Sequence, residues 1–211
     1  MRIDTLRNEY NFSGLTRKNV DGNPIALFKK WLKEAVDSNE KEPTAMTLST
    51  VGVDGFPQSR IVLLKFFDES GFTFFTNYLS EKGKAIKKKP LVCLHFFWRV
   101  SERQVQITGL AEKTSKEISQ NYFQSRPPES RIAAWASEQS REIPSRDYLE
   151  QRFREFSSKF ENQSPPLPSF WGGYKVIPQK IEFWQGRSNR LHDRILYEKT
   201  SDSWAIKRLA P

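Results

Sequence analysis

The sequence predicts a single α+β domain built on a mostly antiparallel, barrel-like β-sheet with helices inserted between its strands. Strand-like runs follow one another from residue 45 onward, turn signals separate many of them, and helical patterns interrupt them at irregular intervals. A regular alternation of strand and helix, which would indicate a doubly wound parallel sheet, is missing from the pattern. The 211 residues are enough for one compact unit.

The first half of the chain predicts one helix followed by a meander of strands. Asn23 and Pro24 have the form of a helix N-cap followed by proline in the first turn, and apolar residues recur at helical spacing after them. A helix is therefore expected over 24–37. Asp54 and Gly55 form a turn signal between two strand-like runs. The strands expected here are 45–53, 58–67 and 72–76.

The second half predicts three helices set among further strands. Ser80 is expected to cap a short helix. Helical spacing predicts two longer helices, over 115–125 and 145–160, and Pro127-Pro128 indicates the end of the first of them. The strands expected in this half are 91–98, 103–112, 180–185, 191–197 and 204–209.

The net charge of +9 favours anionic partners, such as nucleic acid, acidic lipid or phosphorylated small molecules. A lysine-rich run spans 82–89, but most such runs are solvated helix faces, and no nucleic-acid recognition motif accompanies it. No apolar stretch approaches the length that crosses a bilayer, and the N-terminus has no apolar signal segment. We therefore expect neither nucleic acid nor a membrane among the partners.

Cysteine and histidine are too few for several common kinds of site. The single cysteine, Cys93, lies in an apolar run and cannot form a disulfide framework or a cysteine-rich metal site within one chain. A reducing, cytoplasmic location fits this best. Only His95 and His192 are available as imidazole ligands, so no metal site is expected.

Two groups of basic side chains occur in the predicted meander. Arg60 and Lys65 bracket an apolar strand, where their offset places them on opposite faces unless a bulge intervenes. The simpler alternative is a pair of surface charges. Lys82 follows Thr76 and Ser80 at a predicted helix start, where free amides and the helix dipole favour a phosphate. Helix capping alone explains Ser80 equally well.

Two further groups lie later in the chain. Alternation along a strand would place Arg190, His192 and Arg194 on one face, where mutual repulsion favours an anion or an electron-rich ring against them. The alternative is an exposed polar face. Tyr122 and Arg126 are one helical turn apart, which fits either a phosphate clamp or ordinary helix surface.

Several runs of sequence carry a resemblance to a known family. They are RIVLLK (60–65), ERQV (102–105), YFQSRPPES (122–130), PLPSFWGG (166–173), EFWQG (182–186), RLHDR (190–194) and KRLAP (207–211). In this order, over nearly the whole chain, they closely resemble the pyridoxine/pyridoxamine 5'-phosphate oxidases. The pairing of EFWQG with RLHDR is the most specific part of the resemblance.

The resemblance implies a split β-barrel, a homodimer, and one FMN in each of two sites across the subunit interface. It implies oxidation of pyridoxamine or pyridoxine 5'-phosphate by O2 to pyridoxal 5'-phosphate, with release of hydrogen peroxide. The redox step belongs to the cofactor, so the protein needs mainly to align two rings and to anchor two phosphates.

The resemblance also implies roles for individual residues. The FMN contacts would be Arg60, Ile61, Val62, Leu63, Leu64, Lys65, Phe75, Thr76, Lys82, Gln104, Gln139, Ser140, Trp184 and Arg194. The substrate contacts would be Arg7, Tyr10, Lys65, Tyr122, Arg126, Ser130, Arg190 and His192. Arg190 and His192 would orient the substrate ring and assist proton movement. Residues 1–20 would form a mobile segment of the single domain 1–211 that closes over the substrate.

Two positions depart from the family pattern. Glu81 stands where relatives commonly place a basic residue near the FMN phosphate, and Phe75 where a tyrosine is frequent. Other functions remain open: a flavin reductase or another split-barrel oxidoreductase, which needs a nicotinamide donor, and a non-catalytic flavin- or pyridoxal phosphate-binding protein. A nucleic-acid-binding module, whose binding would fall steeply with salt, is the least supported.

Overall fold

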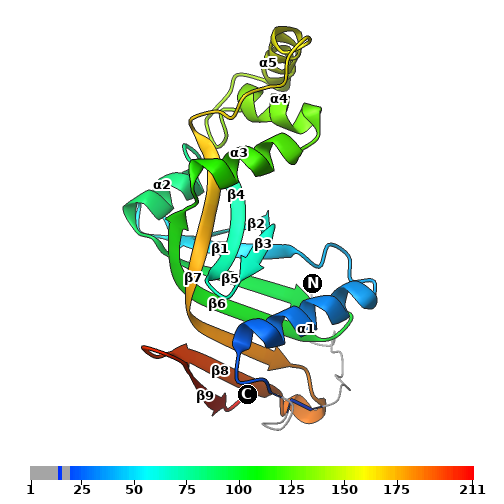
Figure 1. The fold of residues 1–211 in the computed structure, drawn as a ribbon, viewed down its shortest axis with the longest axis vertical. Helices are drawn as coiled ribbons and strands as arrows, with labels where there is room; N and C mark the ends of the chain where they lie inside the picture. Colours follow the sequence, from blue (N-terminus) through cyan, green and yellow to red (C-terminus); the bar gives the residue numbers. More distant parts are fainter. Residues whose placement is uncertain (1–13, 16–19) are drawn as a thin grey trace, which may run out of the picture.

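The computed structural model describes residues 14–15 and 20–211 and contains one antiparallel nine-stranded sheet (Figure 1). The strands are β1 (Ala45–Val51), β2 (Pro57–Leu63), β3 (Phe66–Asp68), β4 (Gly71–Asn77), β5 (Leu91–Trp98), β6 (Arg103–Lys113), β7 (Trp171–Gln185), β8 (Asp193–Lys199) and β9 (Trp204–Leu209). The helices are α1 (Pro24–Asp37), α2 (Glu81–Lys88), α3 (Lys116–Ser125), α4 (Pro128–Ala136), α5 (Arg146–Lys159) and the 3₁₀ turn η2 (Ser188–Arg190). The predicted α+β class is confirmed.

The sheet curls because the chain changes hydrogen-bond partners between β2 and β3. The strand order runs β2-β1-β5-β6-β7-β4-β3, with β8 beside β7 and β9 beside β8. The Leu64 N–H donates to Thr44 O at 2.9 Å, and the next N–H, of Lys65, donates to Thr73 O at 2.9 Å. These two residues therefore join opposite ends of the strand order. The prediction of one continuous strand over 58–67 was wrong, because apolar alternation does not reveal a change of partner.

β7 is the strand that links the two parts of the sheet. It pairs with β6 along its length, with β4 through its first half and with β8 through its second half. The register shifts between Thr108, opposite Lys180, and Gly109, opposite Pro178, which leaves Gln179 as the extra residue of a bulge-like irregularity. Only 180–185 was expected as strand, since Gly172 and Gly173 weaken the strand signal. A Cβ at Gly173 would lie 2.7 Å from Thr114 Oγ1, so this position needs glycine for close packing.

Helix α1 covers the open end of the curled sheet, and its aromatic side chains fill it. Phe28 is fully buried and meets Phe67, Phe72 and Phe96 edge-on at ring distances of 5.1, 5.0 and 5.1 Å. Edge-to-face contacts of this kind stabilise a core beyond the area they bury. The predicted helix and its N-cap are confirmed, because Asn23 Oδ1 accepts a hydrogen bond from the Ile25 N–H at 2.8 Å.

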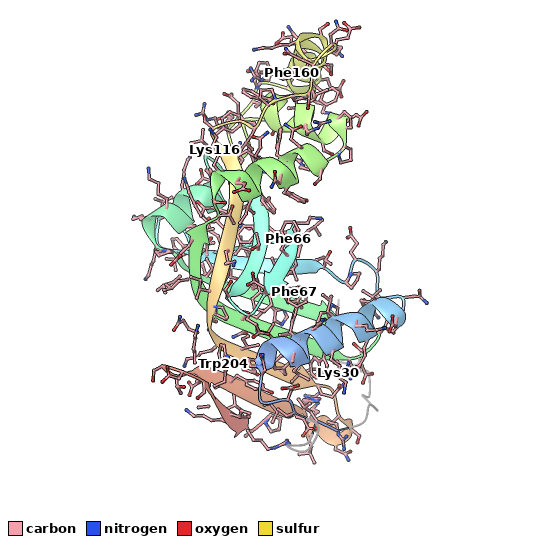
Figure 2. All side chains as sticks on the ribbon, viewed as in Figure 1. Lys30, Phe66, Phe67, Lys116, Phe160 and Trp204 are labelled. Atoms are coloured by element: carbon pink, nitrogen blue, oxygen red, sulfur yellow. The ribbon has the colours of Figure 1, made fainter. Side chains whose placement is uncertain are left out.

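Helices α3, α4 and α5 form a helical cap at the opposite end of the molecule from β8 and β9 (Figure 1). Phe160 at the end of α5 and Trp204 at the start of β9 mark these two ends (Figure 2). Helix α4 was not predicted, because Pro127-Pro128 indicated only a helix end; here Pro128 occupies the first turn of a new helix. None of the described helices is long and apolar enough to cross a membrane.

Candidate active site

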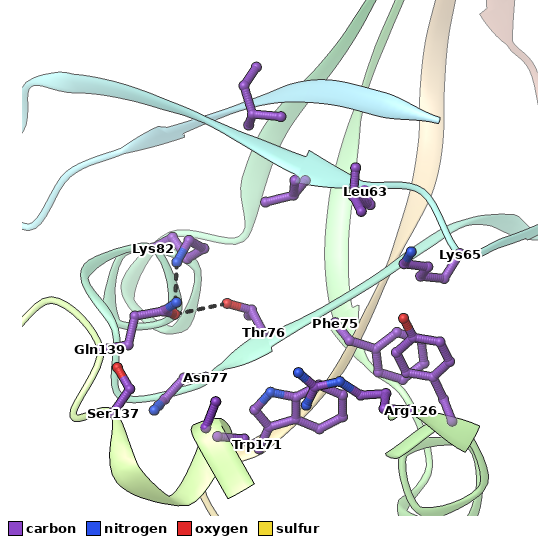
Figure 3. A pocket seen from close by; sticks show the side chains of 15 residues that line it. Leu63, Lys65, Phe75, Thr76, Asn77, Lys82, Arg126, Ser137, Gln139 and Trp171 are labelled. Carbon is purple, nitrogen blue, oxygen red and sulfur yellow. Dashed lines mark hydrogen bonds between the residues drawn. The ribbon is translucent and has the colours of Figure 1, made fainter. Parts of the chain in front are cut away.

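A cavity of about 420 Å³ lies where the end of β2, β4, α2, α3 and α4 meet (Figure 3). We call it the basic pocket. It is lined by Ile61, Val62, Leu63, Lys65, Phe75, Thr76, Asn77, Lys82, Tyr122, Arg126, Ala133, Ala134, Ser137, Gln139 and Trp171. These described lining residues include three cations and no carboxylate. The pocket is therefore suited to an anion.

One side of the basic pocket is built around Lys82, in the first turn of α2. Its ammonium donates to Gln139 Oε1 at 3.0 Å, and the Thr76 hydroxyl reaches the same oxygen at 3.4 Å (Figure 3). Ser80 caps the helix, as predicted, by accepting from the Gly83 N–H. Burial, and secondarily the charge of Arg60, lower the pKa of Lys82 to about 8. A bound anion would favour the charged ammonium again.

Arg60 lies behind this side and does not line the pocket. Its guanidinium donates to Thr50 Oγ1 at 2.7 Å and to the carbonyl oxygens of Gln58 at 3.1 Å and Leu48 at 3.3 Å. Burial lowers its pKa. Lys65, beyond the break that ends β2, does line the pocket. Of the two predicted cations, Lys65 therefore lines the pocket, whereas the charge of Arg60 acts on it indirectly by lowering the pKa of Lys82.

The other part of the basic pocket has an aromatic wall. The rings of Phe75 and Tyr122 stack at 4.0 Å, and Phe75 stacks on Trp171 at 5.5 Å. The Arg126 guanidinium lies over Trp171, with Cζ 4.8 Å from the ring centre. Phe66 adds an edge contact to Tyr122 at 5.8 Å, whereas the adjacent Phe67 packs into the core against α1 (Figure 2).

Arg126 has a buried donor group in the basic pocket. Among the described residues, its buried Nη1 has no hydrogen-bond partner. Burial lowers the pKa of Arg126 and raises that of Tyr122 beside it. An unpaired buried guanidinium nitrogen is costly, and native proteins seldom leave one unsatisfied. A phosphate oxygen would remove this cost by accepting a charge-assisted hydrogen bond.

A second cavity, of about 320 Å³, lies on one face of the sheet across β5 to β8. We call it the sheet-face pocket, and it is lined by His95, Gln104, Gln106, Glu182, Trp184, Arg194 and Pro211. Arg194 donates to both oxygens of Glu182, at 2.7 and 3.2 Å, and to Ala210 O at 3.0 Å. The His192 ring lies 4.6 Å from that of Trp184. The two pockets share no lining residue.

The predicted strand face of Arg190, His192 and Arg194 was wrong. Alternation needs extended backbone, but Asn189 and Arg190 have φ of 56° and 58°, in the left-handed region, and β8 begins only at Asp193. Arg190 is exposed on this turn, and the half-buried His192 accepts from the Arg187 N–H through Nδ1 at 3.1 Å. Left-handed backbone at non-glycine residues costs energy and often occurs at functional sites.

The structure divides the predicted site residues into two groups. The basic pocket contains Ile61, Val62, Leu63, Lys65, Phe75, Thr76, Lys82, Tyr122, Arg126 and Gln139, and the sheet-face pocket contains Gln104, Trp184 and Arg194. Leu64 is buried in the core, whereas Ser130 and Ser140 line neither cavity. Arg7 and Tyr10, with most of the segment 1–20, lie outside the described residues.

Residues that sequence reasoning missed belong mainly to unpredicted elements. Ala133 and Ala134 come from α4, and Trp171 from the unpredicted first half of β7. Glu182 lies inside the EFWQG run, and its contact with Arg194 is a diagonal one between β7 and β8, which depends on a register that the sequence pattern does not give. Within the described part of the chain, no group of three His, Cys, Asp or Glu side chains could hold a metal ion.

Two family models match the chain. The model described as "Pyridoxamine 5'-phosphate oxidase" matches residues 32–160. The model described as "Pyridoxine 5'-phosphate oxidase C-terminal dimerisation region" matches residues 171–211. The first covers the basic pocket except Trp171, and the second covers the β7 and β8 side of the sheet-face pocket.

Full-length relatives and solved structures agree with these matches. The pyridoxine/pyridoxamine 5'-phosphate oxidase of Hahella chejuensis is 52% identical over 100% of both chains, and that of Flavobacterium johnsoniae is 53% identical over 99% of this chain and 98% of its own. PhzG from Burkholderia lata, solved with tetrahydrophenazine-1-carboxylic acid, superposes with a TM-score of 0.90 at 27% identity, over 97% of this chain and 100% of its own. A related FMN binding protein from Nostoc punctiforme (TM-score 0.68, 17% identity, 87% of this chain and 97% of its own) shares the fold.

Proposed function

Because the chain belongs to the pyridoxamine 5'-phosphate oxidase family, we propose that it is an FMN-dependent oxidase that converts pyridoxamine or pyridoxine 5'-phosphate to pyridoxal 5'-phosphate. O2 is the electron acceptor, and hydrogen peroxide is the second product. The observation that carries this proposal is the basic pocket: among the described residues, its lining has three cations and no carboxylate, and the buried Nη1 of Arg126 has no hydrogen-bond partner. Both proposed ligands bring a phosphate.

The basic pocket fits two phosphates at separate positions. On its Lys82 side, the ammonium, the Thr76 hydroxyl and the start of α2 offer donors to the phosphate of FMN. On its aromatic side, Arg126 and Lys65 would hold the phosphate of the substrate, with the Tyr122 hydroxyl beside them. The Arg126 stack on Trp171 holds the guanidinium plane in place before the substrate arrives.

A homodimer would complete each site. Gln104, Trp184 and Arg194 line the sheet-face pocket, and none of them lines the basic pocket. The His192 ring lies against Trp184, and Arg190 is on the turn before β8. Both surfaces carry exposed apolar side chains: Ile61 is 64% exposed beside the basic pocket, and Phe97, in register with Gln104, is 53% exposed. A second copy would cover both and would bring its sheet-face pocket to the first copy's basic pocket.

The chemistry that FMN supplies when bound is acceptance of a hydride from the exocyclic carbon of the substrate and transfer of the electrons to O2. The protein side chains would position the cofactor and the substrate and would stabilise their charges. Trp184 and the Arg194 guanidinium would contact the cofactor, and Arg194 is already held by Glu182. Arg190 and His192, from the turn before β8, would orient the substrate ring and assist proton movement. A phosphate oxygen of the substrate would accept a charge-assisted hydrogen bond from the Arg126 Nη1, which has no partner among the described residues.

One experiment separates this function from the alternatives. The purified protein is loaded with FMN, mixed with pyridoxamine 5'-phosphate under air, and assayed for pyridoxal 5'-phosphate and for hydrogen peroxide. Formation of both without a nicotinamide donor is expected. A flavin reductase would oxidise NADH or NADPH instead, and a non-catalytic binder would retain flavin without turnover. Denaturation should release FMN and not FAD, because the cations of the pocket match single phosphates.

A further inference from the structure

Behind the residues proposed to contact FMN lies a second row of polar side chains. Cross-strand register places Gln104, Trp184 and Arg194 in line on β6, β7 and β8. Two residues along each strand, on the same face, a parallel row contains His95, Gln106 and Glu182 from β5, β6 and β7. All six line the sheet-face pocket. The proposed function uses the first row and leaves His95 and Gln106 without a role.

Two diagonal contacts join the rows. Glu182 holds the Arg194 guanidinium through two hydrogen bonds, at 2.7 and 3.2 Å. On the other side of the pocket, Nε2 of the half-buried His95 lies 3.0 Å from Oε1 of Gln104. An amide oxygen can only accept a hydrogen bond, so in this arrangement the His95 ring must carry its proton on Nε2. Each contact thereby fixes the direction of a side chain in the first row.

We propose that His95 is a positioning residue that holds the Gln104 amide with its NH2 group turned toward the bound cofactor. This role rests on the proposed binding of FMN. Because Gln104 Oε1 accepts from His95, the amide presents its two N–H donors to the pocket. Among the described residues, no hydrogen bond uses that NH2 group. Donors complement the carbonyl oxygens of the flavin ring, whereas a rotated amide would place an oxygen against them.

The chemistry of an amide explains why such a holder matters. The oxygen and the NH2 group of glutamine are nearly equal in size, so half a turn of the amide changes its hydrogen bonding without changing its packing. Gln106, on the same strand and face, is exposed, and no hydrogen bond joins it to Gln104 in the described part of the chain. His95 is the described side chain that hydrogen-bonds this amide, and it selects the present orientation while Nε2 carries the proton, because an unprotonated Nε2 would accept from the rotated NH2 group instead.

The test measures FMN dissociation constants by flavin fluorescence for the wild type, His95→Phe, Gln104→Leu and the double variant. Phenylalanine keeps the size of the ring and removes the donor. His95→Phe should weaken FMN binding about fivefold, the worth of one neutral hydrogen bond. In the Gln104→Leu background, the same change should have no further effect, because His95 acts through the amide. The visible absorption band of bound flavin should shift in both single variants.

Rescue and control variants complete the design. His95→Gln should restore binding to within about twofold of the wild type, since its amide NH2 can donate to Gln104 Oε1. Cys93→Ser, two residues earlier on the same strand and face, is the matched control and should leave binding unchanged. Equal weakening by His95→Phe in both backgrounds, or none in the wild-type background, would overturn this role alone. A wild-type protein that binds no FMN would overturn the proposed function, and this role with it.

Discussion

The basic pocket and the sheet-face pocket treat their positive charges in opposite ways. In the basic pocket, Lys82 and Arg126 are partly buried, their pKa values are lowered, and the buried Nη1 of Arg126 has no described partner. In the sheet-face pocket, Arg194 is neutralised by Glu182, whose hydrogen bonds raise its pKa. The cations of the basic pocket thus lack a described anionic partner, whereas the cation of the sheet-face pocket already has one in Glu182.

This difference indicates what each region can contribute to a shared site. Uncompensated cations bind a phosphate strongly, because the ligand removes an existing desolvation cost. A guanidinium that is already paired adds less charge, but its direction is fixed before the ligand arrives. We therefore expect the basic pocket to anchor phosphates and the sheet-face pocket to orient rings. The predictions below test this division, beginning with the largest effect.

The largest effect is expected from mixing two homodimers of low activity. Arg126→Met and Arg190→Met should each lower kcat/KM about tenfold to a hundredfold, the worth of a charge-assisted hydrogen bond. If the two regions meet across a dimer interface, subunit exchange creates heterodimers in which one of two sites has both arginines. The mixture should recover about a quarter of wild-type activity.

The measurement is peroxide release before and after dissociation and reassociation of the mixed variants. Each variant reassociated alone is the control. Activity that stays at the level of the separate variants would show that both arginines act within one chain, or that no exchange occurs; light scattering and labelled subunits distinguish the second case.

A smaller effect, on cofactor binding, is expected when the Arg194–Glu182 pair of the sheet-face pocket is broken. Arg194→Met should weaken FMN binding about tenfold, because it removes a charged donor and leaves Glu182 unpaired near the cofactor. Arg208→Met is the matched control, since Arg208 pairs with Asp193 on the next strand and does not line the pocket. FMN dissociation is measured by fluorescence. Equal loss in both variants would mean that the effect comes from general destabilisation of β8 and β9.

The pH dependence of FMN binding tests the basic pocket. The pKa of Lys82 is lowered to about 8. A bound phosphate favours the protonated ammonium, so binding above this pKa must take up a proton. Affinity should therefore be highest below pH 8 and fall about fivefold as the pH rises to about 9.5. Lys82→Arg stays charged over this range and should flatten the profile. An unchanged fall in Lys82→Arg would assign the titration to another group.

The smallest effect is expected at Glu81. Its carboxylate pairs with Lys84 at 2.7 Å, and it does not line the basic pocket. Glu81→Arg should tighten FMN binding by about twofold through long-range attraction at the start of α2. Glu81→Gln should produce roughly half of that free-energy change, because it removes the negative charge without adding a positive one. Identical affinities at low salt for all three proteins would show that Glu81 has no influence on the phosphate.

The elements that could be predicted are those whose signals are local. The predicted caps Asn23 and Ser80 each accept a hydrogen bond at the start of a helix, and Ser115 and Ser145, where two further helices were expected to begin, do the same. Strands β5 and β9 have the predicted bounds, since an apolar pattern and flanking breaks delimit them. The missed elements depend on distant partners: the break at Leu64, helix α4 and the first half of β7.

The sequence by itself determined which residues could carry chemistry and which family the chain resembles. Only the tertiary structure decided how these residues divide: Arg60 lies behind the basic pocket, Lys65 faces it, and Arg190 leaves the predicted strand face. The register of β7 and β8 also placed Glu182 within reach of Arg194, whereas Arg126, at the end of α3, has no hydrogen-bond partner for its Nη1 among the described residues. The sequence specifies which residues are charged and how they are spaced along the chain. The free energy of keeping each of them charged depends on its burial and on its neighbours, and only folding brings these neighbours together.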